Sequence, residues 1–354
     1  AAVFRGDRLL GRGATRPAGG PHAEIVALVR AKRRFGINSL RGASLAVTLE
    51  PCNRVGRTGP CTDAILEAGI RRVFVGHRDP HPAGSGAGVR RLRRAGIEVQ
   101  LGVLEEACRE QHRGFSTVCA LGRPFVMLKL ASSLDGRIAT ASGESRWVTG
   151  PDARAKGHLL RSRVDAIVIG SGTALADDPE LTARRGGRVI HRPIRVLVDS
   201  KLRVPPSAKL YREGADRTWV LCGSRAGARR RRVLEDLGAR LLETPTRAGK
   251  LDLKRVAARL AREGLTEILV EGGGSLAAAL LRARLVDELH WFVAPRVLGG
   301  DGRPSIADLG LRSLVESPLL NGRLGRAGCD LYIRGPVEYP ASRGRRARSR
   351  GASR

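Results

Sequence analysis

The sequence predicts two consecutive α/β domains, each built on a mainly parallel sheet covered by helices. The chain has 354 residues, 42% of them hydrophobic, which is enough for two cores. Apolar runs typical of buried strands alternate with segments of helical spacing along the chain. Many of these strands end in Gly, Ser or Asp, and the carboxyl ends of such strands are where α/β proteins build ligand sites.

The first domain spans residues 1–118 and is expected to open with a short apolar strand at 1–5 (AAVFR), followed by a helix at 23–34. The same alternation continues to the end of the domain, with glycines marking the ends of helices. We expect strands at 44–50, 71–80 and 97–102, and helices at 61–69 and 87–96.

The second domain spans residues 122–335 and repeats this order of elements. Residues 336–354 form a basic tail that is expected to be disordered, because it has too few apolar residues to pack. In the domain itself we expect strands at 165–175, 194–200, 217–223, 267–274 and 288–300, with helices at 152–163 and 251–264.

The formal net charge of +30 raises the question of a polyanionic partner. Lysines number only seven, so nearly all of the positive charge is Arg, a usage typical of GC-rich codon choice. Aromatic residues make up 3% of the chain, too few for a base-stacking platform. These observations disfavour nucleic-acid binding as the main function.

The sequence contains no apolar run as long as the ~18 residues of a membrane span, and its start lacks the apolar core of a signal peptide. Six cysteines at irregular spacing do not resemble a disulfide framework. We therefore expect a reducing cytoplasm, in which thiolates are available to a metal. The one methionine is Met127, so we expect a fragment that lacks its initiator.

A His, a Glu and two Cys in the first domain have the pattern of a catalytic zinc site. His22, Cys52 and Cys61 supply three ligands, and such a site keeps its fourth position for water. Glu24 lies two residues after His22, where a carboxylate can exchange protons with that water without binding the metal. A helix that begins near the cysteines favours their thiolate forms. The alternative is a core histidine with two buried cysteines.

At these motifs the chain resembles the bacterial bifunctional riboflavin-biosynthesis deaminase–reductase family. The resemblance runs from the first residues to about Gly335 and covers both halves in the same order. It rests on the segments GGPHAE (19–24), VTLEPC (47–52), GRTGPC (56–61), AILEAGI (64–70) and RPFVMLKLASSLDGRIATASGESRWVTG (123–150).

The resemblance implies a cytidine-deaminase-like three-layer domain followed by a dihydrofolate-reductase-like domain. The first would use zinc-activated hydroxide to deaminate 2,5-diamino-6-(5-phosphoribosylamino)pyrimidin-4-one, with Glu24 moving protons. The second would use NADPH to reduce the ribosyl group to ribityl phosphate. A small phosphorylated pyrimidine is thus the expected partner, and a homo-oligomer through the reductase domain is usual for the family.

Three departures from the family pattern concern the deaminase half. The chain starts inside the first strand, so the family's first helix and Asn-Pro loop are expected to be missing. Asn53 and Arg54 stand where Ser and His are common, and Thr58-Gly59-Pro60 replaces Thr-Pro-Pro. One alternative is therefore a reductase with an impaired deaminase half. An alternative from another class is a basic nucleic-acid-binding protein or polynucleotide-editing deaminase.

The clearest signal in the second half is EGGGSLAAALL (271–281), a strand that runs through three glycines into an apolar helix. Glycines let amide groups approach a phosphate, and the helix N-terminus favours the anion. A purely structural turn is the alternative. By resemblance, the cofactor NADPH is contacted by Ala131, Trp147, Thr173, Asp177, Ser200, Gly273, Gly274, Ser275, Leu276, Ala277, Ala278 and Ala279.

Substrate contacts in the second half also follow from the resemblance. Arg161 ends the segment HLLR, and its guanidinium suits the ribose phosphate because it offers a fork of donors. Without the resemblance, the sequence predicts equally well that Arg161 is a solvated helix residue. It then predicts an ordinary polar loop at ASGESRW (141–147). Lys129 is a further candidate, for polarising the sugar near C1′. The substrate residues expected by resemblance are Ser145, Arg161, Leu181, Arg184 and Glu271.

Overall fold

The computed structural model describes residues 1–17, 19–54 and 59–340, and the chain forms two compact units, Ala1–Gly122 and Arg123–Arg354. The prediction of a disordered tail from residue 336 is wrong at its start, because residues 336–338 end a strand that pairs with its neighbours in the sheet. Residues 341–354 of that tail lie outside the described residues, and so does Thr58. In the part of the chain that is described, no helix is long and apolar enough to cross a membrane.

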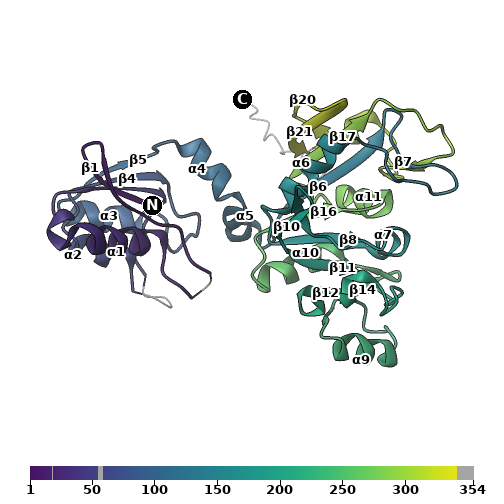
Figure 1. The fold of residues 1–354 in the computed structure, drawn as a ribbon, viewed down its shortest axis with the longest axis horizontal. Coiled ribbons are helices and arrows are strands. Elements are labelled where there is room, and N and C mark those ends of the chain that lie inside the picture. Colours follow the sequence, from purple (N-terminus) through teal and green to yellow (C-terminus); the bar gives the residue numbers. More distant parts are fainter. Residues whose placement is uncertain (18, 55–58, 341–354) are drawn as a thin grey trace, which may run out of the picture. The chain divides into compact units, whose positions relative to one another are not determined.

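The first unit is built on a mixed sheet. Among its described residues the strand order is β2-β1-β3-β4-β5. Figure 1 labels β1, β4 and β5 of this sheet. The neighbours β3–β4 and β4–β5 are parallel, as expected, whereas β1 pairs antiparallel with both β2 and β3. The antiparallel β1–β2 hairpin was not predicted. The strands are β1 (Ala2–Arg5), β2 (Arg8–Arg12), β3 (Ser44–Leu49), β4 (Arg72–His77) and β5 (Glu98–Leu101).

Helices cover both faces of this sheet and give three layers. The apolar faces of α1, α2 and α3 bury Leu28, Ile65 and Leu92 against the sheet in one continuous core. Helix α4 contacts β4 on the other face, where Cys108 lies over Gly76. The helical segments are α1 (Ala23–Phe35), η1 (Ile37–Ser39), α2 (Cys61–Glu67), α3 (Ala87–Arg94), α4 (Glu105–Gln111) and α5 (Arg113–Leu121).

The second unit has a larger sheet, whose order in the described residues is β13-β12-β11-β8-β16-β6-β17-β21-β19, with β20 paired to β21. All neighbours from β13 to β17 are parallel, and β21 runs antiparallel to β17. The strands of this sheet are β6 (Phe125–Ser133), β8 (Ala166–Gly170), β11 (Ile194–Val198), β12 (Thr218–Cys222), β13 (Arg240–Glu243), β16 (Glu267–Glu271), β17 (Glu288–Ala294), β19 (Leu319–Leu320), β20 (Arg323–Ala327) and β21 (Asp330–Glu338).

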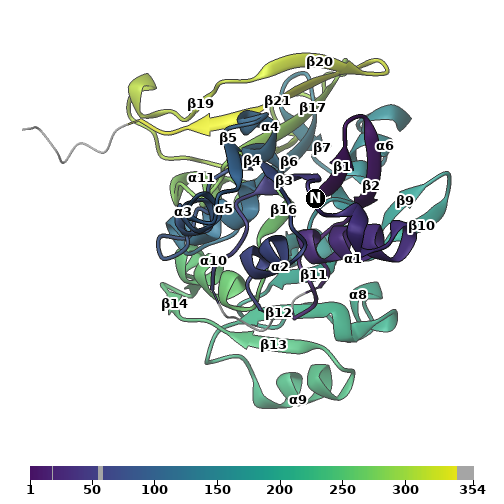
Figure 2. The same ribbon diagram turned by 90° about the vertical axis from the view of Figure 1, so that its left-hand side faces the viewer.

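Two apolar cores fill the two faces of this sheet. Figure 2 shows α9 next to β13 at one end of the sheet. Helices α10 and α11 bury Leu260 and Leu280 on one face, and α7, α8 and α9 cover the other. The helical segments are α6 (Pro151–Arg161), α7 (Ser171–Asp177), α8 (Lys209–Arg212), η2 (Ala215–Arg217), α9 (Ala228–Asp236), α10 (Leu253–Arg262), α11 (Gly274–Arg282) and η3 (Leu314–Glu316). Short hairpin strands are β7 (Arg137–Ala139), β9 (Ala183–Arg185), β10 (Arg188–His191), β14 (Thr246–Arg247), β15 (Lys250–Leu251) and β18 (Arg303–Pro304).

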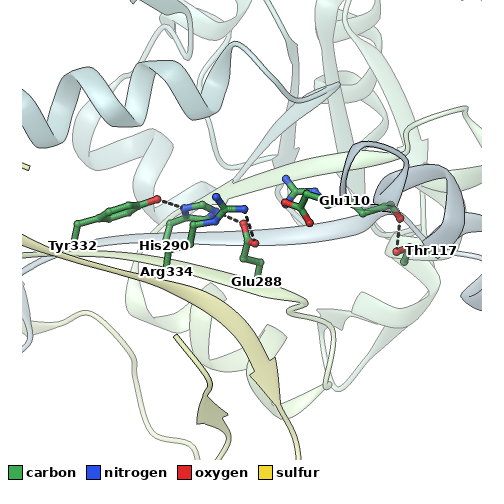
Figure 3. Close-up of polar contacts among 7 residues, drawn as sticks. Glu110, Thr117, Glu288, His290, Tyr332 and Arg334 are labelled. Carbon is green, nitrogen blue, oxygen red and sulfur yellow. Dashed lines mark hydrogen bonds and ion pairs between the residues drawn. The ribbon is translucent and has the colours of Figure 1, made fainter. Parts of the chain in front are cut away.

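A polar network joins β17 to β21 (Figure 3). His290 is 1% exposed, with Nδ1 2.7 Å from the Tyr332 hydroxyl and Nε2 2.5 Å from Glu288 Oε1. Arg334 donates to the other oxygen of Glu288 at 3.1 Å. Both ring nitrogens of His290 therefore have partners, as burial of a polar side chain requires. Lys129 of β6 is the register neighbour of His290, so this network borders the face that carries the candidate site.

Candidate active sites

His22, Cys52 and Cys61 lie together in the first unit. His22 Nδ1 is 3.2 Å from Cys61 Sγ and 3.4 Å from Cys52 Sγ, and the three ligand atoms all lie within 4.8 Å of one another. In a zinc tetrahedron with ordinary bond lengths, nitrogen and sulfur ligands stand about 3.6 Å apart. A hydrogen bond with Cys61 lowers the pKa of Cys52, which favours an anionic sulfur in the pair. The donor set therefore fits zinc.

Two of the three ligands lie at the starts of helices, and Cys52 lies in the loop after β3. His22 is the N-cap of α1, and Cys61 is the first residue of α2. The amide of Cys61 donates to Cys52 Sγ at 3.3 Å, as expected where helix-start amides lack partners within the helix. Asn53, one of the departures from the family pattern, accepts from Thr62 at 3.0 Å and from Arg91 at 2.8 Å. The loop that carries Cys52 is thus tied to α2 and α3.

Glu50 holds the other side of this loop and was not predicted from the sequence. Its carboxylate is 4% exposed and accepts from the amides of Asp79, Gly86 and Val89 at 3.1, 2.8 and 3.0 Å. Close packing reinforces this anchor, because a Cβ at Gly88 would lie 2.0 Å from the carbonyl oxygen of Pro51.

Glu24 lies in the first turn of α1 beside the three ligands. It is 8% exposed, and burial raises the pKa of its carboxyl group. A carboxylate that holds protons more readily than usual, next to a metal site, is suited to taking and returning protons. The structure thus places Glu24 beside the three ligands, and its role in proton transfer stays a prediction.

In the second unit, two expected cofactor residues meet at the carboxyl ends of adjacent strands. Thr173 follows β8 and Gly273 follows β16, and the Thr173 hydroxyl accepts from the Gly273 amide at 2.9 Å. Gly274 opens α11 against the 304–307 segment, where a Cβ would lie 2.4 Å from the Pro304 carbonyl oxygen. Later in the predicted run, Ala277 and Ala278 are buried in the core. The first turn of α11 therefore offers amides to a phosphate, while its later residues position the helix.

Three residues expected at the substrate form a charged cluster on the same edge. Arg161, at the end of α6, donates from Nε and Nη2 to both oxygens of Glu271 at 2.7 and 2.8 Å. Burial opposes the charge of Glu271, but Arg161 and Lys129 outweigh it and lower the pKa of Glu271 to about 2. Burial also lowers the pKa of Lys129, against the attraction of Glu271. Arg161, expected as a phosphate ligand, is thus engaged by a carboxylate.

Arg184 is linked to this cluster through Thr182, which the sequence did not single out. Thr182 is 4% exposed; its carbonyl accepts from Arg161 Nη1 and its hydroxyl from Arg184 Nε, each at 3.1 Å. Arg184 also pairs with Glu180. Leu181, between Glu180 and Thr182, is 4% exposed and has a positive φ of 54°. The segment therefore brings a cation and a buried leucine to the cluster.

The remaining residues expected at the cofactor or the substrate have their described contacts outside this charged cluster. The Trp147 ring is 63% exposed, with the Arg154 guanidinium 4.7 Å from its centroid, and it lines a cavity of about 340 Å³. Ser200 donates to the carbonyl of Gly249 at 3.4 Å. Burial raises the pKa of Asp177, at the end of α7. Ser145 lies two residues before Trp147 in the loop after β7, and Ala131 lies on β6.

A zinc-binding α/β/α unit with a carboxylate beside the ligands is typical of deaminases that act on nucleobases. The second unit, with its parallel sheet and glycine turn at the strand ends, has the architecture of a dihydrofolate-reductase-like domain. Together they define a deaminase joined to a reductase.

Comparison with known proteins supports this class for both units. Residues 1–77 match the family model "Cytidine and deoxycytidylate deaminase zinc-binding region", and residues 124–324 match "RibD C-terminal domain". The riboflavin biosynthesis protein RibD of Aquifex aeolicus is 38% identical over 334 residues, 94% of this chain and 90% of that protein.

Two solved structures extend the comparison. RibD of Acinetobacter baumannii has a TM-score of 0.83 and 34% identity, covering 95% of this chain and 91% of that one. A Thermotoga maritima protein described as a diaminohydroxyphosphoribosylaminopyrimidine deaminase/5-amino-6-(5-phosphoribosylamino)uracil reductase has a TM-score of 0.79 and 31% identity, covering 95% and 90%. The chain belongs to the RibD family of bifunctional deaminase–reductases of riboflavin biosynthesis.

Proposed function

We propose that the first unit deaminates 2,5-diamino-6-(5-phosphoribosylamino)pyrimidin-4-one and that the second reduces the ribosyl group of the product to ribityl phosphate with NADPH. The meeting of His22, Cys52 and Cys61 within 4.8 Å carries the first half of this proposal. The contact between Thr173 and Gly273, beside the pair Arg161–Glu271, carries the second. The Thermotoga maritima protein is described as a deaminase of a diaminohydroxyphosphoribosylaminopyrimidine and a reductase of 5-amino-6-(5-phosphoribosylamino)uracil, which supports this pair of reactions.

In the deaminase unit the three ligands would hold zinc, which lowers the pKa of a water molecule and so makes a nucleophile available near neutral pH. Glu24 would take the proton released from this water and deliver it to the amino group that leaves as ammonia. Its buried position, with a raised pKa, supports this transfer. Asn53 and Glu50 would keep the Cys52 loop in place through their hydrogen bonds.

In the reductase unit NADPH would supply the hydride, and the protein would orient it. The amides at the start of α11, with Thr173 beside them, would receive the cofactor diphosphate. Trp147, next to the cavity on the β17 side, would border the nicotinamide. Ala131, Asp177 and Ser200 complete the proposed cofactor contacts, with the run Gly273, Gly274, Ser275, Leu276, Ala277, Ala278 and Ala279.

The substrate would meet the charged cluster at the strand ends. Arg184 would bind the ribose phosphate in exchange for Glu180, and Arg161 would add a second positive charge. Arg161 holds Glu271 as a carboxylate, whereas burial favours the uncharged amine of Lys129. Lys129 would act near C1′ of the sugar, and Ser145 and Leu181 would complete the pocket.

We also propose a homo-oligomer through the reductase unit. Four apolar side chains near its sheet edge are largely exposed. Light scattering on the intact protein tests this, with Leu324→Arg expected to shift the mass toward the monomer. The exposed fractions are 91% for Leu314, 70% for Val315, 65% for Leu319 and 70% for Leu324.

Two half-reactions in one preparation test the catalytic proposal. We expect ammonia release from the diamino substrate and NADPH oxidation with the deaminated substrate. Glu24→Gln is expected to abolish ammonia release and keep NADPH oxidation, and Glu271→Gln to do the reverse. NADPH oxidation without ammonia release in the unmodified protein contradicts the deaminase half, and ammonia release without NADPH oxidation contradicts the reductase half.

A further inference from the structure

His158 stands beside the expected substrate arginines, and neither the sequence motifs nor the proposed roles include it. It lies on α6, three residues before Arg161, so the two side chains share a face of the helix. Its Nδ1 accepts from the backbone amide of Arg184 at 3.2 Å and lies 3.2 Å from the carbonyl oxygen of Thr182. A residue of α6 thus reaches the segment that carries Arg184.

His158 Nδ1 has two backbone neighbours at the same distance, and the tautomer of the ring decides which of them it bonds. A backbone N–H cannot change its role, so the amide of Arg184 requires a lone pair on Nδ1, with the imidazole proton on Nε2. The Thr182 carbonyl is then left to the Arg161 guanidinium, which donates to it at 3.1 Å. Neutral His158 therefore satisfies the Arg184 amide without competing for the partner of Arg161.

The surroundings of His158 favour this neutral form. Burial is the main cause that lowers the pKa of its imidazole, and the positive charge of Arg161 lowers it further. The Thr182 carbonyl and Glu271 act in the opposite direction, and Arg184 adds to the lowering. In the neutral form with the proton on Nε2, His158 offers Nδ1 as an acceptor to the Arg184 amide.

We propose that His158 is a positioning residue that sets Arg184 for the phosphate of the reductase substrate. The inference rests on the proposed reductase function. The amide nitrogen of Arg184 is bonded to the Cα that carries its side chain, so the contact with His158 fixes the start of that side chain. The Thr182 hydroxyl accepts a hydrogen bond from Nε and so fixes its guanidinium end. With both anchors, the cation is pre-organised, so that binding loses less freedom.

Loss of this anchor should weaken substrate binding and leave hydride transfer intact. His158→Leu removes the acceptor, and His158→Met is a second form of the same deletion with a more adaptable side chain. His158→Asn keeps an acceptor near the position of Nδ1. Leu159→Ala is the matched control, because Leu159 is the next residue on α6 and is 48% exposed.

The test measures kcat and KM for the deaminated substrate and for NADPH, together with the Kd of ribose 5-phosphate for the intact protein. The Leu and Met variants are expected to raise the substrate KM and the ribose 5-phosphate Kd by about three- to tenfold, as the loss of one hydrogen bond would. Their kcat and NADPH KM should stay within about twofold of the original protein. The Asn variant and Leu159→Ala should behave like the original.

Two results would overturn the inference. One is an unchanged substrate KM in both deletion variants. The other is an equal loss of kcat and of both KM values in the Leu, Met and Asn variants, which indicates general structural damage. Failure of the proposed function looks different, because the unmodified protein would then neither oxidise NADPH with the substrate nor bind ribose 5-phosphate.

Discussion

Replacing Glu271 with Gln should destabilise the second unit by about 3 kcal/mol. Glu271 and Arg161 are 12% and 20% exposed, so water screens their pair weakly. Their interaction, with Lys129 nearby, brings the pKa of Glu271 to about 2. Against about 4.3 for an ordinary glutamate, this difference corresponds to about 3 kcal/mol at neutral pH. A loss of this size agrees with the ~3–5 kcal/mol lost when one partner of a buried ion pair is removed.

The sign of the pH dependence follows from the lowered pKa. The contribution of Glu271 is fully present above its unfolded pKa of about 4.3 and disappears as the pH falls toward about 2. Glu271→Gln lacks this group, so its stability difference from the original protein should shrink over that range. At neutral pH the loss corresponds to a Tm decrease of about 6–12 °C for a unit of this size.

Tryptophan fluorescence reports this unfolding selectively, because Trp147, Trp219 and Trp291, the three tryptophans of the chain, all belong to the second unit. Glu213→Gln is the control. Glu213 pairs with Arg192 at 3.8 Å and both are at least half exposed, so its loss should cost below about 1 kcal/mol. A Tm decrease for Glu271→Gln no larger than that of the control would refute the reasoning.

Three further predictions concern other contacts. Thr173→Val removes the acceptor of the Gly273 amide and should raise the NADPH KM about three- to tenfold, with the substrate KM unchanged in steady-state assays. Tyr332→Phe deletes the hydroxyl bound to His290 and should cost about 0.5–1.5 kcal/mol in urea unfolding; an unchanged midpoint speaks against the network. Burial lowers the pKa of His112, so the first unit should lose stability as the pH falls through and below the ordinary imidazole range near 6.5. His112→Phe should flatten that loss in far-ultraviolet dichroism, and an equally steep profile would contradict it.

The zinc ligands could be predicted from the sequence because each lies at the end of a regular element. His22 precedes α1, Cys61 opens α2, and Cys52 follows β3, so the order of elements alone brings them to one edge. The glycine turn at β16 was equally visible, since a strand and an apolar helix flank it.

The missed features depend on contacts between distant segments. Thr182 lies outside the strands and helices, and its role appears only when α6 packs beside it. His158 could have been found from its spacing of three residues before Arg161. Strand β20 was missed because its residues are mostly exposed and show no apolar alternation; it exists through pairing with β21.

X-ray absorption at the zinc edge tests the central claim most directly. For the purified protein we expect about one zinc per chain, with two sulfur neighbours at about 2.3 Å and nitrogen or oxygen neighbours at about 2.0–2.1 Å. Cys61→Ser should lower the sulfur count and the zinc content together. Zinc bound without sulfur neighbours, or a zinc content that Cys61→Ser leaves unchanged, would contradict the assignment of the first unit as a zinc deaminase.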